Sequence, residues 1–269
     1  MKTKLKGPGM TIALFCRDVL FRGRCKTKHL MIVVFVLCLS VLPQMAFAAD
    51  PEVNLVPWPQ SLSVTGGEMS LDGSSQIVYS DASLAGLAQI VAEEVEEVTR
   101  WQLTITQGTP LAGDIYLAYT ADPSIMGEAY KVTVGSYAMA EADNYNAVAM
   151  ASVTLIQALK VSYGYWSIPE MTVDDAPDVG YRGFMVDLAR NYHSIDTLKE
   201  VVDMCRLYKI RYLQLHPTDD QAFTFPSTAY PDLAAYGHTY TLAEMNDLAD
   251  YADARGVIIT PEIDVPGHG

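Results

Sequence analysis

The sequence predicts an α/β protein in which a small α+β domain, residues 50–177, precedes repeated βα units in residues 178–269. Three observations predict this arrangement. Short apolar runs alternate with two helical patterns in the first segment. In the second segment, strand, helix, strand, helix and strand follow one another in order. Polar and ionisable residues come directly after each of these last three strands, where α/β proteins hold their sites.

Residues 1–48 have the order of a secretory signal peptide. Basic residues run through Lys26 and Lys28, an apolar stretch follows from Leu30 to Leu42, and Ala46-Phe47-Ala48 offers a small-x-small cleavage site. A membrane anchor is the alternative interpretation, but the apolar stretch is shorter than the roughly 20 residues that a span needs. We therefore expect cleavage after Ala48, no stable membrane anchor, and a secreted or periplasmic protein.

The charge of the chain argues against nucleic-acid and membrane partners. Residues 1–48 hold eight of the 18 Lys and Arg residues and one of the 32 Asp and Glu residues, so the remainder has a formal net charge of −21. A surface this negative repels phosphate backbones and anionic lipids.

Cysteine usage is sparse. Cys16, Cys25 and Cys38 lie within residues 1–48, which leaves Cys205 alone in the rest of the chain. A single thiol cannot form an internal disulfide. Because Cys205 falls among the apolar positions of a helical pattern, we expect it to be buried and structural.

Four strands and two helices are predicted for residues 50–177. The first helical pattern, Ala82 to Thr99, has Leu, Ile and Val on one side and glutamates largely on the other. The second, Tyr145 to Val161, is rich in alanine. The predicted strands are Gln76–Tyr79, Leu103–Thr106, Asp114–Ala118 and Tyr130–Val134. The polar, proline-containing stretch Val173–Asp178 is expected to separate this domain from the rest.

Three strands and two helices are predicted for the second segment. Ser194 is expected to cap the first helix. Thr241 and Glu244 form a capping box for the second helix, which is expected to end near Arg255-Gly256. The predicted strands are Tyr181–Asp187, Tyr212–Leu215 and Val257–Thr260. Units of this kind build either a doubly wound sheet or a (β/α)8 barrel.

Polar clusters follow the three predicted strands. Arg190 comes after the first strand, His216 to Gln221 after the second, and Glu262 to His268 after the third. Adjacent parallel strands would bring Arg190, either Asp219 or Asp220, and His268 to one rim. There the arginine could bind a small polar ligand through forked hydrogen bonds, and an Asp–His pair could hold a defined protonation state. The structural alternative is that Arg190 pairs with Asp187 and that Asp219 caps a turn.

A metal site is the competing chemistry for the same residues. The possible ligands are His216, Asp219, Glu262, Asp264 and His268. However, the sequence has neither a helical His pair at i, i+4 nor the Cys/His spacing of a typical zinc site. We therefore predict no metal and no other cofactor.

Three motifs stand at these strand ends: Asp187-Leu188-Ala189-Arg190, Leu215-His216-Pro217-Thr218-Asp219-Asp220-Gln221 and Pro261-Glu262-Ile263-Asp264-Val265-Pro266-Gly267-His268. Together they resemble the successive barrel motifs of glycoside hydrolase family 20, the β-N-acetylhexosaminidases. Leu55-Val56-Pro57-Trp58-Pro59-Gln60 and Tyr181-Arg182-Gly183 are similar to the starts of that family's accessory domain and of its barrel. The resemblance covers residues 52–269. It implies a (β/α)8 barrel, with about three of its eight strands present, preceded by the small α+β domain.

The resemblance also implies roles for individual residues. Arg190 matches the arginine that binds the hydroxyls of the sugar at the non-reducing end. Asp219 and His268 match a supporting pair that orders the catalytic acid and tunes it electrostatically. Asp264 is expected to support this pair without touching the substrate.

The sequence departs from the family pattern at several positions. Gln214 and Pro217 replace a histidine and a leucine that are usual around the second strand, and Asn191 replaces the histidine usual after Arg190. These differences concern loop geometry more than chemistry.

The larger departure is the lack of an adjacent Asp-Glu pair, which the family carries after its fourth strand. The glutamic acid protonates the leaving oxygen, and the aspartate orients the acetamido group of the substrate as nucleophile, a substrate-assisted retaining mechanism. No such pair follows here. We therefore expect an inactive piece of a β-N-acetylhexosaminidase that acts on oligosaccharides or glycoconjugates containing N-acetylhexosamine. The alternative is a non-catalytic secreted protein that binds carbohydrate or another partner.

Overall fold

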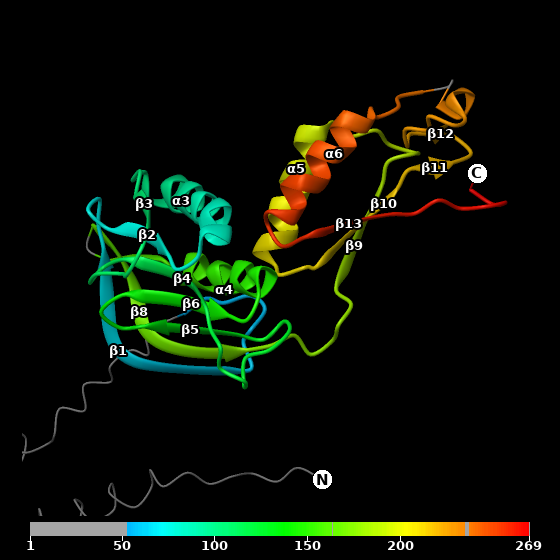
Figure 1. Ribbon diagram of the computed structural model, residues 1–269. Helices are drawn as coiled ribbons and strands as arrows, with labels where there is room; N and C mark the ends of the chain where they lie inside the picture. The colour runs from blue at the N-terminus through cyan, green and yellow to red at the C-terminus, as the bar shows by residue number, and fades with distance from the viewer. Residues whose placement is uncertain (1–52, 163, 235–236, 269) are drawn as a thin grey trace, which may run out of the picture. The chain divides into compact units, whose positions relative to one another are not determined.

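Two larger β-sheets and a short hairpin organise the chain in the computed structural model of this protein (Figure 1). The structure describes residues 53–162, 164–234 and 237–268. The signal peptide expected at residues 1–48 lies outside these ranges. Within them, no helix combines the length and the apolar character that crossing a membrane requires.

The first sheet is mixed and has eight strands in the order β1-β8-β5-β6-β4-β2-β3, with β7 paired to β8. β2 runs parallel to β3 and β4, and β4 runs parallel to β6. The pairs β5–β6, β5–β8, β1–β8 and β7–β8 are antiparallel. The bounds are β1 (Ser61–Leu71), β2 (Gln76–Tyr79), β3 (Thr104–Gln107), β4 (Ile115–Tyr119), β5 (Tyr130–Val134), β6 (Ala138–Ala142), β7 (Lys160–Ser162) and β8 (Tyr165–Asp175).

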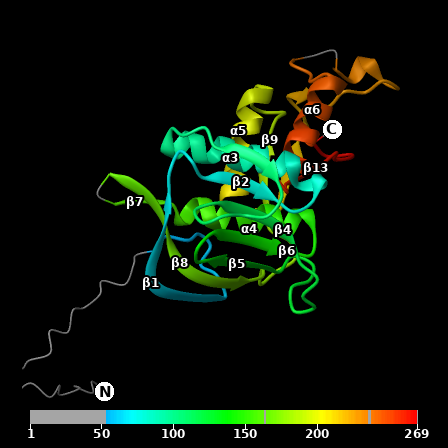
Figure 2. The ribbon, with the colours of Figure 1, turned by 60° about the vertical axis from the view of Figure 1, so that its left-hand side comes forward.

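Two helices, α3 (Ala85–Thr99) and α4 (Tyr145–Ala158), cover one face of this sheet (Figures 1 and 2). A 3-10 turn, η2 (Ala82–Leu84), leads into α3, and the Asn144 side chain caps α4 by accepting a hydrogen bond from the Ala147 N–H. The apolar sides of the helices and the inward side chains of the strands form one core. Its fully buried members include Leu71, Ile77, Leu87, Ile115, Leu117, Leu155, Ile168 and Met171.

The elements predicted for this part of the chain are present, with ends shifted by up to three residues. β2 and β5 have the predicted bounds. The second helix ends at Ala158, so that Lys160–Ser162 forms β7 instead of a last helical turn. Residues Val173–Asp175 belong to β8, so of the expected separating stretch only residues 176–178 lie outside a strand.

Besides β7, three strands of this sheet were not predicted, each for a physical reason. β6 reads Ala-Met-Ala-Glu-Ala, a composition that favours a helix, and β8 contains Pro169. In β1, the pairing with β8 shifts register between Val64 and Glu68, and Gly66 within this bulge has a positive φ of 88°. A bulge interrupts the two-residue alternation that would reveal a strand in the sequence.

The second sheet has three parallel strands in the order β13-β10-β9. Its strands are β9 (Gly183–Asp187), β10 (Tyr212–His216) and β13 (Ile258–Pro261), and its helices are α5 (Ile195–Leu207) and α6 (Leu242–Asp253). The hairpin β11 (Thr218–Asp219) and β12 (Ala222–Phe223) and the 3-10 turn η3 (Pro231–Ala234) lie between β10 and α6. The predicted order of strands and helices is thus confirmed.

The predicted helix starts of this second part are confirmed. The Ser194 side chain accepts a hydrogen bond from the Thr197 N–H, and the Thr241–Glu244 capping box is complete. Cys205 is buried and free, as expected, and burial raises the pKa of its thiol to about 11. This cysteine is therefore a core residue with little thiolate character at neutral pH.

The second sheet has one face that helices cover and one open face, and the side chains of its central strand β10 point alternately to the two. Leu213 and Leu215 are fully buried and belong to the core that α5 and α6 complete. Because side chains alternate along a strand, Gln214 and His216 point to the opposite face. On that face Met185, which lies beside Gln214 in the register, is exposed. The polar end of β10 therefore projects away from the helices.

Buried ionic contacts join α5 to the first sheet's helices. The Arg206 guanidinium, fully buried, pairs with the Glu94 carboxylate through Nε–Oε1 (2.6 Å) and Nη2–Oε2 (2.9 Å). It also donates to the Ala149 carbonyl (2.9 Å) and the Ser152 hydroxyl (3.0 Å). A buried guanidinium needs partners for all its donors, so the position of α5 depends on these groups of α3 and α4.

We expect Glu94→Gln to lower the free energy of unfolding by at least about 2 kcal/mol, since removing one partner of a buried ion pair costs about 3–5 kcal/mol. The amide keeps the shape of the side chain but leaves the Arg206 charge uncompensated. Urea unfolding followed by circular dichroism measures the change. Glu97→Gln, at an exposed position of the same helix, is the matched control, and an equal loss in both variants would contradict this role of Glu94.

Candidate active site

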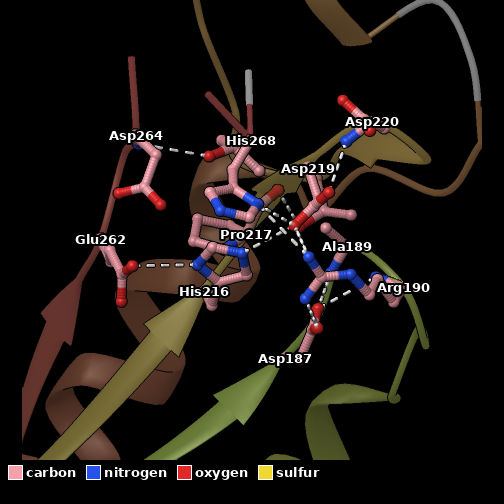
Figure 3. Close-up of polar contacts among 12 residues, drawn as sticks. Asp187, Ala189, Arg190, His216, Pro217, Asp219, Asp220, Glu262, Asp264 and His268 are labelled. Carbon is pink, nitrogen blue, oxygen red and sulfur yellow. Dashed lines mark hydrogen bonds and ion pairs between the residues drawn. The ribbon is translucent and has the colours of Figure 1, made fainter. Parts of the chain in front are cut away.

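The polar clusters meet at the carboxyl ends of β9, β10 and β13 (Figure 3). Since the three strands are parallel, these ends lie at one edge of the sheet. Arg190 follows β9, Asp219 lies in β11 directly after β10, and His268 lies beyond β13. The structure thus brings together the three residues that the sequence places at one rim.

Asp187 at the end of β9 orients Arg190. Its Oδ1 accepts hydrogen bonds from the N–H groups of Ala189 (3.1 Å) and Arg190 (3.0 Å), and its Oδ2 pairs with Arg190 Nη1 (2.7 Å). The other end of the same guanidinium, Nη2, pairs with Asp219 Oδ2. The ion pair between Arg190 and Asp187, which the sequence offered as the structural alternative, is therefore present together with the contact between Arg190 and Asp219. With a side chain 46% exposed, Arg190 is still open to a ligand.

Asp219 is the buried centre of the cluster, with a side chain only 3% exposed. Its carboxylate accepts hydrogen bonds from His268 Nδ1 (2.9 Å), His216 Nε2 (3.2 Å) and the Asp220 N–H (2.7 Å). Burial alone would raise the pKa of Asp219, but these hydrogen bonds and the Arg190 charge outweigh it and lower the pKa to about 2. The group is thus a permanent anion at physiological pH.

His216 links Asp219 to a second carboxylate. Its Nε2 faces Asp219 and its Nδ1 lies 3.1 Å from Glu262 Oε1. Burial favours the neutral ring, yet hydrogen bonds to the two carboxylates raise the pKa of His216. Since ionised carboxylates only accept, a ring that donates from both nitrogens is an imidazolium. With His216 protonated, Arg190, Asp219, His216 and Glu262 form a row of alternating charges.

Glu262 is held by the neighbouring strand as well. Gln214 Nε2 donates to Glu262 Oε2, and this hydrogen bond, together with the His216 contact, lowers the pKa of Glu262 against the effect of burial. Asp264 lies just beyond Glu262 (Figure 3), and its N–H is 3.5 Å from Thr218 Oγ1. The segment after β13 is thereby fastened to both β10 and β11.

Two groups of side chains have ligand atoms close enough together for a cation: His216, Asp219 and His268, and His216, Glu262 and Asp264. His216 is common to both, and each of its nitrogens already faces a carboxylate. The Arg190 guanidinium next to Asp219 would repel a cation in the first group. The geometry therefore suits hydrogen bonding to a polar ligand better than metal binding.

Sequence reasoning left several members of this network without a role. It treated His216 and Glu262 only as possible metal ligands, Asp187 only as an alternative partner of Arg190, and Gln214 only as a difference from the family. The available signal was the two-residue period of β10, which places Gln214 and His216 on one face. Asp220, offered as an alternative to Asp219, is exposed and contributes its N–H.

Two family descriptions match almost the whole described chain. Residues 52–176 match "Glycosyl hydrolase family 20, domain 2", and residues 180–269 match "Glycosyl hydrolase family 20, catalytic domain". The chain belongs to glycoside hydrolase family 20. The Arg190–Asp219–His268 cluster thus lies in the part that matches the family 20 catalytic domain.

Named relatives agree with family 20 membership. The chain is 25% identical to a β-hexosaminidase of Porphyromonas gingivalis and 27% identical to a β-N-acetylhexosaminidase of Cellulomonas fimi, over 81% of its own length in both cases. It spans 31% and 47% of the length of these two relatives.

Solved family 20 structures share the fold. The β-N-acetylhexosaminidase of Streptomyces coelicolor has a TM-score of 0.74 at 26% identity, covering 81% of this chain and 47% of that one. The exo-β-N-acetylglucosaminidase of Vibrio harveyi, solved in complex with N-acetylglucosamine, has a TM-score of 0.71 at 25% identity, covering 81% and 37%.

The depressed pKa of Asp219 predicts how the cluster responds to acid. A pKa of about 2, below the ordinary 3.8, means that ionised Asp219 stabilises the fold above about pH 4 and that this contribution is lost as the pH falls towards about 2. We expect Asp219→Asn to lower the melting temperature at pH 7 and the difference from the unmodified chain to shrink below about pH 4. Asp220→Asn, at the exposed neighbour, is the control. A difference that does not change with pH would contradict the assignment.

Proposed function

We propose that this chain forms part of a β-N-acetylhexosaminidase that releases terminal N-acetylhexosamine by a substrate-assisted retaining mechanism. The observation that carries the proposal is the contact of Arg190 and His268 with one buried carboxylate, Asp219, at the ends of three parallel strands. The names of the family 20 relatives support the substrate class, since they include β-hexosaminidases and an N,N'-diacetylchitobiase of Vibrio harveyi.

The three-stranded sheet is, in this proposal, the start of a (β/α)8 barrel in residues 178–269, with residues 50–177 as its accessory domain. In the described residues, β9 and β13 each pair with β10 alone, so each has an open edge. Phe184 and Met185 of β9 are exposed, which is unusual for the apolar residues of a parallel strand. Further strands and helices of a barrel would cover these residues.

Each residue of the cluster has a distinct part in the proposed reaction. Arg190 donates charged hydrogen bonds to the sugar hydroxyls while Asp187 and Asp219 hold its plane. The His268 side chain is 56% exposed, and its Nδ1 is engaged by Asp219, so that Nε2 remains for the catalytic acid. Asp219 thereby fixes the ring's orientation and tautomer. Asp264 supports the loop that carries His268.

The catalytic acid itself would come from outside these residues. The mechanism needs an adjacent Asp-Glu pair, and no Asp-Glu dipeptide occurs among the 269 residues. The chain alone is therefore expected to be inactive. This observation also favours the second candidate function, a secreted or periplasmic carbohydrate-binding protein without catalysis. Neither candidate needs a cofactor, a nucleic acid or a membrane anchor.

Sequencing of the DNA beyond the Gly269 codon discriminates between the two candidates. A continuing frame of about 160 residues, enough to complete a typical barrel of about 250 residues, with an Asp-Glu pair supports the enzyme. The completed protein should hydrolyse para-nitrophenyl N-acetyl-β-glucosaminide, and the 269-residue chain should not. A stop codon there, with a stable secreted product, supports the non-catalytic protein.

For the completed enzyme we expect Arg190→Ala to lower kcat/KM at least tenfold on every substrate. Hydrogen bonds from a charged group are worth about 1.5–3 kcal/mol each, and about 1.4 kcal/mol corresponds to a factor of ten. Steady-state kinetics gives the ratio. Arg255→Ala serves as the control, because Arg255 follows α6 and pairs with Asp203 of α5, on the helices and not at the rim. A near-normal kcat/KM for Arg190→Ala would reject the assignment.

A further inference from the structure

A second concave site lies at the opposite ends of the parallel strands. It is a pocket of about 310 Å³, lined by residues of α4, of the 175–182 connection and of the turn before β10. Arg182 and Arg211, immediately before β9 and β10, line it, whereas the candidate active site follows the carboxyl ends of these strands. Five residues of strand separate the two sites by about 16 Å. The volume is in the range of small-molecule sites, about 300–1,000 Å³.

Two exposed aromatic residues line this pocket. Trp58 is 67% exposed and Tyr208 is 48% exposed, although large aromatic side chains are usually well buried. Neither side chain makes a hydrogen bond or ring contact with the described part of the chain. Ala147 and Met150 of α4, which are buried, also line the pocket and give it an apolar wall.

The charges around the pocket cancel. Arg182 is paired with Glu128 by two hydrogen bonds (3.1 and 2.9 Å), and Lys209 Nζ lies 3.8 Å from Asp175 Oδ2. Lys209 also donates to the hydroxyls of Tyr130 (2.6 Å) and Thr154 (2.9 Å). In all, three cations face three carboxylates: Arg182, Lys209 and Arg211 against Glu128, Asp175 and Asp178. A pocket with no net formal charge gives no preference to an ionic ligand.

Neutral polar groups of the pocket remain available. Asn146, at the start of α4, lines it, and its side-chain amide makes no hydrogen bond with any residue that the structure describes. An amide both donates and accepts, and the Trp58 indole N–H and the Tyr208 hydroxyl add further polar groups to the lining. Flat apolar surfaces beside neutral hydrogen-bonding groups match a sugar ring, which has C–H faces and a hydroxyl rim.

We propose that this pocket is a second carbohydrate site that binds an uncharged oligosaccharide of N-acetylhexosamine, apart from the candidate active site. Trp58 and Tyr208 stack on sugar faces, and Asn146 bonds a hydroxyl or acetamido group. Only the choice of sugar rests on the proposed function. A glycan held here stays close to the active site, which raises its effective concentration there.

Isothermal titration of the full chain with N,N'-diacetylchitobiose tests the proposal. Binding to the unmodified chain should be saturable. Trp58→Ala and Tyr208→Ala should each weaken it at least tenfold without a change in melting temperature, because both side chains are exposed. Tyr165→Ala, at an exposed tyrosine of β8 outside the pocket, is the matched control and should bind normally. Cellobiose, which lacks acetamido groups, should bind more weakly.

The same titration of an Arg190→Ala variant distinguishes binding at this site from binding at the candidate active site. Binding that depends on Trp58 and persists in Arg190→Ala supports the second site, whether or not the completed enzyme is active. Binding that Arg190→Ala abolishes and Trp58→Ala leaves intact overturns the second site while the proposed function stands. The absence of saturable binding also overturns the second site, and equal affinity for cellobiose and N,N'-diacetylchitobiose overturns its assignment to N-acetylhexosamine.

Discussion

The carboxylate of Asp219 is the constraint on which the candidate active site depends. A buried anion is stable only when partners compensate its lost hydration, and here they come from three segments: Arg190 after β9, His216 on β10 and His268 after β13. The cluster therefore requires the parallel register of the three strands. In return, the loops after β9 and β13 acquire defined positions, because each supplies a partner that Asp219 needs.

A buried charge also constrains the junction of the two sheets, but there the charge is positive. Arg206 is a buried cation that needs Glu94, Ala149 and Ser152, and these partners lie on α3 and α4. The apolar residues form two separate clusters, one around α3 and α4 and the other around α5 and α6. Polar contacts rather than a shared core thus orient the second sheet. Ion pairs with fixed geometry set a relative position more specifically than apolar packing does.

Most elements could be predicted because their signals are local. Ser194 and the Thr241–Glu244 box marked helix starts, and the alternation of apolar and polar residues in β5 marked a strand. β6 could not be predicted, since its alanines form a strand only through pairing with β4 and β5. Likewise, Arg190, Asp219 and His268 could be placed at one rim from strand order. The bridging of His216 to Glu262 depends on tertiary positions that spacing does not reveal.

The excess of carboxylates at the rim fits the chemistry proposed for it. Four carboxylates, of Asp187, Asp219, Glu262 and Asp264, face one guanidinium, of Arg190, and two imidazoles, of His216 and His268. Gln214, where the family usually has histidine, donates to Glu262 as a neutral amide and adds no compensating charge. Glycoside cleavage develops positive charge on the sugar ring in its transition state. Fixed anions stabilise such charge more than they stabilise the neutral substrate, so a net negative rim would assist the proposed reaction, while a neutral pocket at the other strand ends would suit binding without chemistry.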